Sequence, residues 1–355
     1  MTHAEIAVWI VIAGFSSFVI TYTLATRPSM VRLTTLKYQA DHAIHSRPTP
    51  RVGGLAVVAT SLIVAVIHFP GMDVQAIVFS CLPIVLGGLL EDFGIGISPR
   101  NRLTLAALCC LALYIFTGTM IDRVGLPGVD AALSLSLVGL TFTVFLLSGV
   151  THAFNLVDGL NGLLAVISTF SSLTLAALAV IAGDQEVAMF MVLMASITVG
   201  FGAMNFPFGK VFMGDTGSYF LGFSLGATGV YLMSRHDDLS PWSVLLALFW
   251  PLHETVLTIA RRVVTRKRVF SPDQEHTHHL VLRLVRRHMI GRITAGWENP
   301  MSTVVLLPFI LAPNIFSLWS WNDPSFGLAS VLSFLFVYTL GYVLLRSCAS
   351  DSGRG

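Results

Sequence analysis

Residues 162–182 read GLLAVISTFSSLTLAALAVIA, an apolar run that contains no charged side chain. A helix needs about 20 mostly apolar residues to cross the roughly 30 Å hydrocarbon core of a bilayer. The run is therefore predicted to be a transmembrane helix. The segment that leads into it, Ala153-Phe-Asn-Leu-Val-Asp-Gly-Leu-Asn-Gly-Leu163, is polar and contains turn-forming dipeptides. Apolar runs separated by short polar segments continue along the rest of the chain.

The composition supports the same interpretation. Of the 355 residues, 54% are hydrophobic and 11% are charged, which leaves too few polar side chains to cover a water-soluble globule. We therefore expect an all-α, polytopic membrane protein of about eleven transmembrane helices, forming one domain over residues 1–355. The predicted spans lie near residues 5–26, 52–69, 75–90, 103–119, 132–151, 162–182, 188–204, 218–234, 242–260, 303–320 and 326–345.

The basic residues predict the orientation of these spans. With the N-terminus outside, only Arg123 and Arg235 of the 21 Lys and Arg residues fall on the outer side. The positive-inside rule strongly favours this arrangement, which places the C-terminus in the cytoplasm. The net charge of +2 gives no reason to expect a nucleic acid partner. The four cysteines lie in or beside apolar runs and are predicted to be buried packing residues.

Five polar clusters interrupt the apolar pattern. Polar groups that face lipid are costly, so each cluster needs a reason. On the predicted topology all five lie on the cytoplasmic side, which indicates one shared site. The clusters are His45-Ser-Arg-Pro-Thr-Pro-Arg-Val-Gly-Gly54, Gly88-Leu-Leu-Glu-Asp-Phe93 with Ser98-Pro-Arg-Asn-Arg-Leu103, the segment 153–163, Asn205-Phe-Pro with Lys210-Val-Phe-Met-Gly-Asp-Thr-Gly-Ser218, and Ser271-Pro-Asp-Gln-Glu-His-Thr-His-His-Leu280.

The residue types in these clusters suit chemistry at a diphosphate. Carboxylates can hold Mg²⁺, which prefers oxygen ligands and neutralises phosphate charge during phosphoryl transfer. Basic and histidine side chains can offset the remaining negative charge, and the N–H groups at the helix start after Gly214 could bind a phosphate. The candidate carboxylates are Glu91, Asp92, Asp158 and Asp215, and the candidate cationic groups are Arg47, Arg51, Lys210 and the histidines.

Each cluster also has a simpler interpretation. Glu91 and Asp92 fit a solvated turn at a helix end, and Asp158 precedes a glycine, as in many turns. Asp215 fits the N-cap of the next helix. His276, His278 and His279 lack the spacing of a known transition-metal site. The functional interpretation therefore rests on the five clusters taken together.

These motifs resemble those of the polyprenyl-phosphate N-acetylhexosamine-1-phosphate transferases. Pro-Thr-Pro-Arg-Val-Gly-Gly, the acidic pair, Asn-Leu-Val-Asp-Gly-Leu-Asn-Gly-Leu, Val-Phe-Met-Gly-Asp-Thr-Gly-Ser and the histidine motif occur in the family's order, over nearly the whole chain. The resemblance implies transfer of an N-acetylhexosamine 1-phosphate from a UDP-sugar to undecaprenyl phosphate, with release of UMP. It further implies Mg²⁺, with Mn²⁺ as a substitute, and an active site on the cytoplasmic face of the bacterial inner membrane, where a cell-surface glycan is initiated.

The resemblance also implies roles for individual residues. Glu91, Asp92 and Asp158 are the expected catalytic group, and Asp215 with Asp158 the expected metal ligands. The expected substrate-binding residues are Arg47, Arg51, Asn155, Asn161, Asn205, Lys210, His276, His278 and His279.

The chain departs from the family pattern in several places, one of which is that His42-Ala43-Ile44 before His45 lacks the basic pair often seen there. Glu91 and Glu254 stand where aspartate is commoner, and Asn161 stands where many members have aspartate. A membrane transporter and an inactive homologue are the rival interpretations. The identity of the sugar, the number of chemical steps and the formation of a homodimer stay open.

Overall fold

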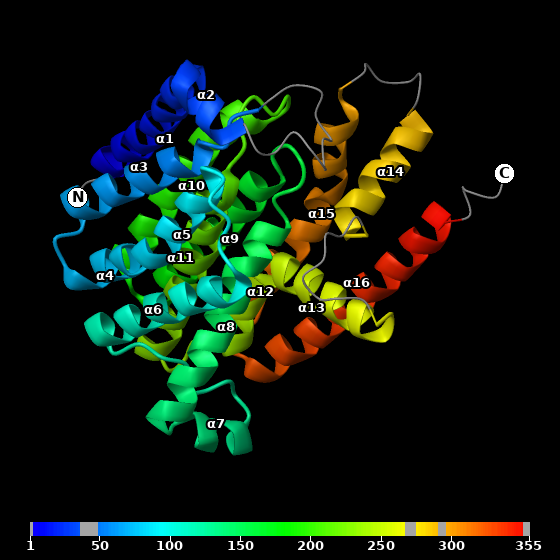
Figure 1. Ribbon diagram of the computed structural model, residues 1–355. Helices are drawn as coiled ribbons and strands as arrows, with labels where there is room; N and C mark the ends of the chain where they lie inside the picture. Colours follow the sequence, from blue (N-terminus) through cyan, green and yellow to red (C-terminus); the bar gives the residue numbers. More distant parts are fainter. Residues whose placement is uncertain (1–2, 36–48, 267–274, 290–295, 351–355) are drawn as a thin grey trace.

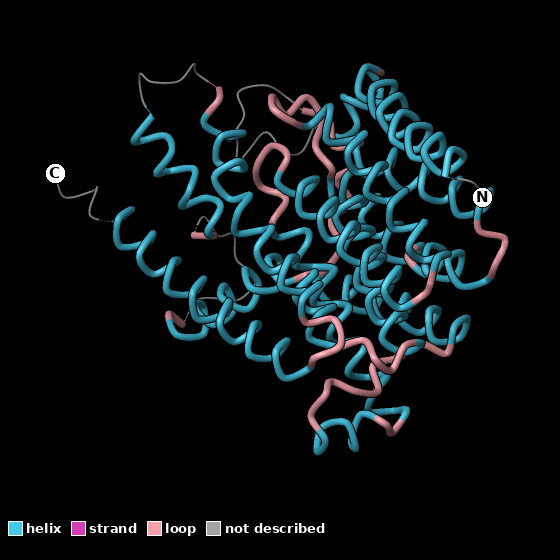
Figure 2. The backbone as a smooth tube through the Cα atoms, turned by 180° about the vertical axis from the view of Figure 1, so that it is seen from behind, coloured by secondary structure: helices cyan, strands magenta, loops and turns pink. Residues whose placement is uncertain are grey.

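The computed structural model describes residues 3–35, 49–266, 275–289 and 296–350, and these residues form helices without any strand (Figures 1 and 2). The all-α prediction is confirmed. The helices are α1 (His3–Thr26), α2 (Pro28–Thr35), α3 (Gly53–His68), α4 (Met72–Ser80), α5 (Leu82–Asp92), α6 (Pro99–Thr117), α7 (Pro127–Leu133), α8 (Ser136–Leu156), α9 (Leu163–Ala182), α10 (Gln185–Asn205), α11 (Gly214–Arg235), α12 (Pro241–Ala247), α13 (Phe249–Val264), α14 (Thr277–Met289), α15 (Glu298–Trp319) and α16 (Pro324–Ser350).

Every predicted span falls on one helix or on two consecutive helices. Within the described ranges, seven helical stretches are long and apolar enough to cross a membrane, and the bent pair α12–α13 brings the number to eight. The chain is therefore a polytopic membrane protein. The count of eleven stays a prediction, because α3 is short and α6 and α11 do not meet the same length and composition test.

Helix α11 lies inside the bundle, where α3, α5, α8 and α9 pack around it. Nearly all of its side chains are buried, although many are Gly, Ser or Thr. Small residues allow helix backbones to approach closely in a membrane protein. A Cβ at Gly54 of α3 would lie 2.5 Å from the Cα of Gly217, and a Cβ at Gly88 of α5 would lie 2.6 Å from the Cα of Thr216. Helices α3 and α5 therefore both cross α11 at its N-terminal turn.

The span predicted near 242–260 consists of two helices that meet at 84°. Pro251 explains the break, because proline has no N–H and is tolerated only in the first turn of a helix. The carbonyl of Ala247, four residues earlier, accepts instead from the Ser171 hydroxyl at 2.7 Å. Helix α13 therefore leaves the direction of α12 and packs against α8, α15 and α16.

The two ends of the bundle carry different side chains. Helices α2 and α14 lie toward one end and α7 toward the other (Figure 1). At the α7 end, Arg123 donates to the carbonyls of Met233, His236 and Leu239, each at 3.0 Å. The described parts of the five polar clusters belong to the opposite end, at the helix termini that the topology prediction assigned to one side.

Candidate active site

The first and fourth clusters pair through their backbones. The Phe212 N–H donates to the carbonyl of Pro50 at 2.9 Å, and the Gly53 and Gly54 N–H groups donate to Phe212 and Met213 at 3.0 and 2.7 Å. The Arg51 N–H also reaches the hydroxyl of Thr34 on α2 at 3.3 Å. These bonds hold the backbone of Arg51 beside the start of α11.

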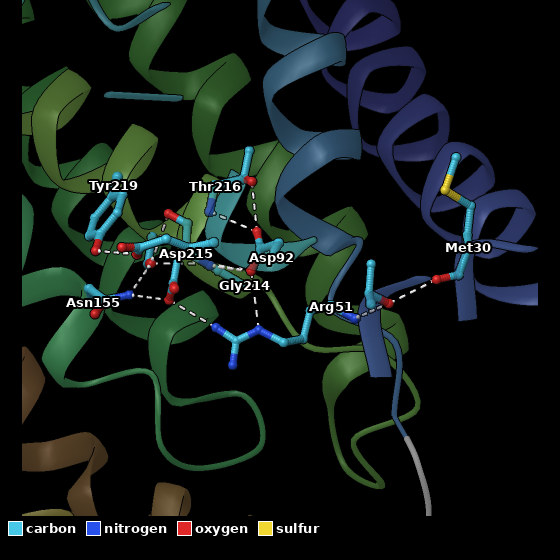
Figure 3. A network of polar contacts seen from close by, with 11 residues as sticks. Met30, Arg51, Asp92, Asn155, Gly214, Asp215, Thr216 and Tyr219 are labelled. Carbon is cyan, nitrogen blue, oxygen red and sulfur yellow. Dashed lines mark hydrogen bonds and ion pairs between the residues drawn. The ribbon is translucent and has the colours of Figure 1, made fainter. Parts of the chain in front are cut away.

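Asp92 binds the N-terminus of α11. Its Oδ1 accepts from the Asp215 N–H at 2.8 Å, and its Oδ2 accepts from the Thr216 N–H at 2.9 Å and from the Thr216 hydroxyl at 2.6 Å (Figure 3). The first N–H groups of a helix lack partners inside it and favour a negative charge. Gly214 begins the helix at φ +78°, and a Cβ there would lie 2.6 Å from both Asp92 oxygens. The expectation that these N–H groups bind phosphate is therefore wrong for Asp215 and Thr216.

Arg51 joins two of the candidate carboxylates. Its Nε lies 3.1 Å from Asp92 Oδ1, and its Nη2 lies 2.8 Å from Asp215 Oδ1. Asn155 at the end of α8 donates to the same Asp215 oxygen at 2.7 Å and to the Ser218 hydroxyl at 2.9 Å. Figure 3 shows these side chains converging from the segment before α3 and from α5, α8 and α11. Arg51 and Asn155 thus orient the Asp215 carboxylate through Oδ1.

Glu91 points in a different direction from its neighbour. Its Oε1 accepts from Arg102 Nε at 2.6 Å, and its Oε2 accepts from the Tyr219 hydroxyl at 3.0 Å. Adjacent helix residues differ by about 100° around the axis, which separates the two carboxylates. Glu91 is therefore held between α6 and α11, where it also lies next to the Asp215 carboxylate, whereas Asp92 is bound by Arg51.

Asp158 belongs to the same electrostatic neighbourhood, in the loop between α8 and α9. Burial raises its pKa to about 7; the Arg51 guanidinium opposes that rise, and the charges of Asp215 and Asp92 add to it. A hydrogen bond to the Gly214 backbone also stabilises its charged form. The three aspartates that the sequence predicts to converge therefore do so.

The histidine motif reaches this loop from α14. A Cβ at Gly159 would lie 2.5 Å from His278 Nε2, so the imidazole rests against the backbone beside Asp158. The rings of His276 and His279 lie 5.4 and 4.2 Å from that of His278. Burial lowers the pKa of His278, and the two neighbouring imidazoles lower it further. His278 is therefore neutral at physiological pH.

Asn161 and Asn205 shape the adjoining loops. The Asn161 side chain donates to the Pro207 carbonyl at 2.8 Å. The Asn205 side chain accepts from the Gly162 N–H at 2.5 Å and donates to the Val211 carbonyl at 2.7 Å. Both asparagines are buried. The Asn205 amide is bonded to the backbone through both its oxygen and its nitrogen, whereas the Asn161 Oδ1 has no hydrogen-bond partner among the described residues.

Two further cationic residues were predicted to bind substrate, Lys210 and Arg47. Lys210 is exposed and is not part of the bonds described above. Arg47 lies outside the described residues. One prediction elsewhere in the chain is wrong: Cys348 is exposed, whereas Cys81, Cys109 and Cys110 are buried.

The structure adds residues to which the sequence interpretation gave no role. Arg102 and Tyr219 hold Glu91, and Thr216 binds Asp92. Asn299 accepts from the Asn161 N–H at 2.7 Å. Arg102 lies within a polar cluster that was noted, and Thr216 follows Asp215 directly. Tyr219 and Asn299 lie at the ends of apolar runs, where no sequence signal marks them.

The donor set fits a magnesium ion that is shared with a substrate. In the ranges that the structure describes, no group of three or more His, Cys, Asp or Glu side chains could hold a metal ion alone. Mg²⁺ usually takes one or two carboxylates and completes its shell with substrate phosphates and water. Asp215 and Asp158 match that need, and their mutual repulsion favours a cation between them.

Several known proteins are similar to this chain over most of its length. Residues 74–233 match the model of glycosyl transferase family 4. An undecaprenyl-phosphate α-N-acetylglucosaminyl 1-phosphate transferase of Thermotoga maritima is 32% identical over 313 residues, 88% of each chain. A probable undecaprenyl-phosphate N-acetylglucosaminyl 1-phosphate transferase of Bacillus subtilis is 26% identical over 285 residues, 78% of each chain. A decaprenyl-phosphate N-acetylglucosaminephosphotransferase of Mycolicibacterium smegmatis is 28% identical over 313 residues, 78% of this chain and 76% of the relative.

The fold and the site thus define a polytopic membrane enzyme that transfers a sugar phosphate to a polyprenyl phosphate. The chain belongs to glycosyl transferase family 4, within its polyprenyl-phosphate sugar-1-phosphate transferases.

Proposed function

We propose that the protein transfers N-acetylglucosamine 1-phosphate from UDP-N-acetylglucosamine to undecaprenyl phosphate, releasing UMP and initiating a cell-surface glycan. The observation that carries the proposal is the convergence of Asp92, Asp158 and Asp215 with Arg51 at one end of a membrane helix bundle. The names of the Thermotoga and Bacillus relatives support the choice of sugar and lipid. The active site faces the cytoplasm of the bacterial inner membrane in this proposal.

The reaction exchanges one phosphoanhydride for another. A lipid phosphate oxygen forms a bond to the sugar-bearing phosphorus, and the bond from that phosphorus to the bridging oxygen breaks, so UMP leaves with the electron pair. Mg²⁺, held by Asp215 and Asp158, would neutralise charge on the diphosphate. Arg51 supplies fixed positive charge beside Asp215, and Asn155 orients that carboxylate. The chain's own contribution is therefore positioning and charge neutralisation.

A cavity of about 180 Å³ between α13, α14, α15 and α16 suits the first part of the prenyl chain. Its volume far exceeds the roughly 10–15 Å³ that one water molecule needs. Thr277, the residue before His278, lies on its wall. The apolar lining includes Val281, Val305, Leu306, Phe309, Val337, Tyr338, Gly341 and Leu345.

The proposal is tested with purified protein, UDP-N-acetylglucosamine labelled in the sugar, undecaprenyl phosphate and Mg²⁺. We expect equal amounts of UMP and labelled lipid, and neither product after chelation of the metal. UDP-N-acetylgalactosamine and UDP-glucose serve as matched donors, which we expect to react more slowly. Formation of no labelled lipid from any of the three donors would contradict the proposal.

A further inference from the structure

One face of α13 holds the segment in which the histidine motif begins. Glu254, Thr258 and Arg261 follow one another at spacings of four and three residues, which places them on one side of the helix. Each contacts a different residue of the segment 275–277, in antiparallel order. The pairs are Arg261 with Glu275 at 2.5 Å, Thr258 with His276 Nδ1 at 3.1 Å, and Glu254 with the Thr277 N–H at 3.1 Å.

Glu254 caps the N-terminus of α14. Its Oε2 accepts from the N–H of Thr277, the first residue of that helix. An N-terminal N–H has no partner inside the helix, and a carboxylate there also interacts favourably with the helix dipole. Only 1% of the Glu254 surface is exposed, and a buried carboxylate is costly without a compensating bond. The bond to Thr277 compensates Oε2, while Oε1 is buried without a hydrogen-bond partner among the described residues.

The capped residue, Thr277, directly precedes His278 of the candidate active site. His278 follows Thr277, is 1% exposed and rests against Gly159. The first turn of α14 fixes where its imidazole lies, so the α13 contacts act on that ring through the backbone. The bend of 84° between α12 and α13 turns the α13 face toward this segment.

We propose that Glu254, assisted by Thr258 and Arg261, is a positioning residue that sets the His278 imidazole for binding of the nucleotide-sugar. The inference rests on the proposed function, because His278 is assigned there to the nucleotide-sugar. A purely structural role for Glu254 predicts a general loss of folded protein. A positioning role predicts a selective change in the KM for the donor.

The kinetic test compares Glu254→Ala, Glu254→Gln and Thr255→Ala. Glu254→Ala removes the acceptor, so we expect the KM for UDP-N-acetylglucosamine to rise about tenfold, as loss of a bond to a charged group does. The KM for undecaprenyl phosphate, whose proposed cavity Glu254 also lines, should change much less. Glu254→Gln retains an oxygen at the same reach and should restore the donor KM to within about threefold of the parent. Thr255→Ala is the matched control, because its hydroxyl donates to the Pro251 carbonyl within α13. Unchanged donor KM in Glu254→Ala, or an equal rise in both KM values, would overturn the proposal.

A second measurement does not depend on turnover. In the intact protein, hydrogen exchange of the peptide that covers the start of α14 should be faster in Glu254→Ala than in the parent, and close to the parent in Glu254→Gln. If Glu254→Ala does not fold, Thr258→Val replaces it, and the same changes are expected because the contact to His276 is lost. Absence of transferase activity in the parent would refute the proposed function alone. Unchanged exchange in the folded variant would refute the positioning role, whatever the activity.

Discussion

At the scale of single residues, the acidic pair divides into two different roles. The sequence predicts Glu91 and Asp92 as one catalytic unit. The structure gives Asp92 four donors, from Arg51, Asp215 and Thr216, and gives Glu91 a separate pair of partners. No sequence pattern could reveal this division, because Thr216 and Asp215 lie more than 120 residues from the pair. The carboxylates themselves were predictable, since charged groups at helix ends of a membrane protein are rare.

Asp92→Asn should destabilise the protein by about 1–3 kcal/mol, because one carboxamide cannot accept from all four donors and its NH₂ faces N–H groups. Thr216→Val removes one hydroxyl and should cost about 1 kcal/mol. Thermal unfolding in detergent measures both, alongside transferase activity. If Asp92→Asn abolishes activity while its unfolding midpoint stays at the parent value, Asp92 is a reacting group and its anchoring role is unimportant.

At the scale of helices, the apolar runs predicted where the helices lie but not where a span is broken into two helices. The bend between α12 and α13 depends on Pro251 and on the Ser171 hydroxyl of α9, which bonds the Ala247 carbonyl. The local sequence around the bend does not predict the contact with Ser171. The buried position of α11 was also unexpected, because its small polar residues reduce its apolar character. Those residues form the closest helix crossings at the site.

Gly54→Ala should separate α3 from α11, because the added Cβ meets backbone atoms of Gly217 that cannot rotate away. We expect a loss of about 1–3 kcal/mol in stability and a lower transferase rate. Gly149→Ala on α8 is the control, since nothing lies within 4 Å of its added Cβ, and it should be neutral or stabilising by up to about 1 kcal/mol. Equal stability of the two variants would exclude the close crossing.

Gly341→Leu tests the lipid cavity. Gly341 lines it, and nothing lies within 4 Å of an added Cβ, so the new side chain can occupy the space. The KM for undecaprenyl phosphate should rise about tenfold, which corresponds to about 1.4 kcal/mol of lost binding, while the donor KM stays constant. Gly149→Leu provides the control for added bulk on a helix. A variant with an unchanged lipid KM would place the prenyl chain elsewhere.

At the scale of the whole molecule, the main prediction, that the five polar clusters share one site, rested on the predicted topology. Alternating spans and the bias of Lys and Arg placed five distant clusters on one side, and the described parts of all five contribute to the bundle end that holds Asp215. Sequence alone could not assign individual contacts there. Asn161 and Asn205, for example, are predicted to bind substrate, and the sequence did not predict their bonds to the loop backbones.

The orientation can be tested by thiol accessibility. In a Cys348→Ser background, which removes the exposed cysteine, Lys210→Cys should react with a membrane-impermeant reagent only in inverted vesicles. Asp237→Cys, beyond the opposite end of α11, should react only in intact cells. Labelling of both positions from the same side would contradict the topology.

The most direct test of the account is Mn²⁺ binding, measured by electron paramagnetic resonance in the presence of UDP-N-acetylglucosamine. The parent protein should retain bound Mn²⁺, and Asp215→Asn should lose most of it while remaining folded. Asp73→Asn, at the α7 end of the bundle, should bind as the parent does. Equal Mn²⁺ binding by the parent and Asp215→Asn would show that the converging carboxylates do not hold the cation.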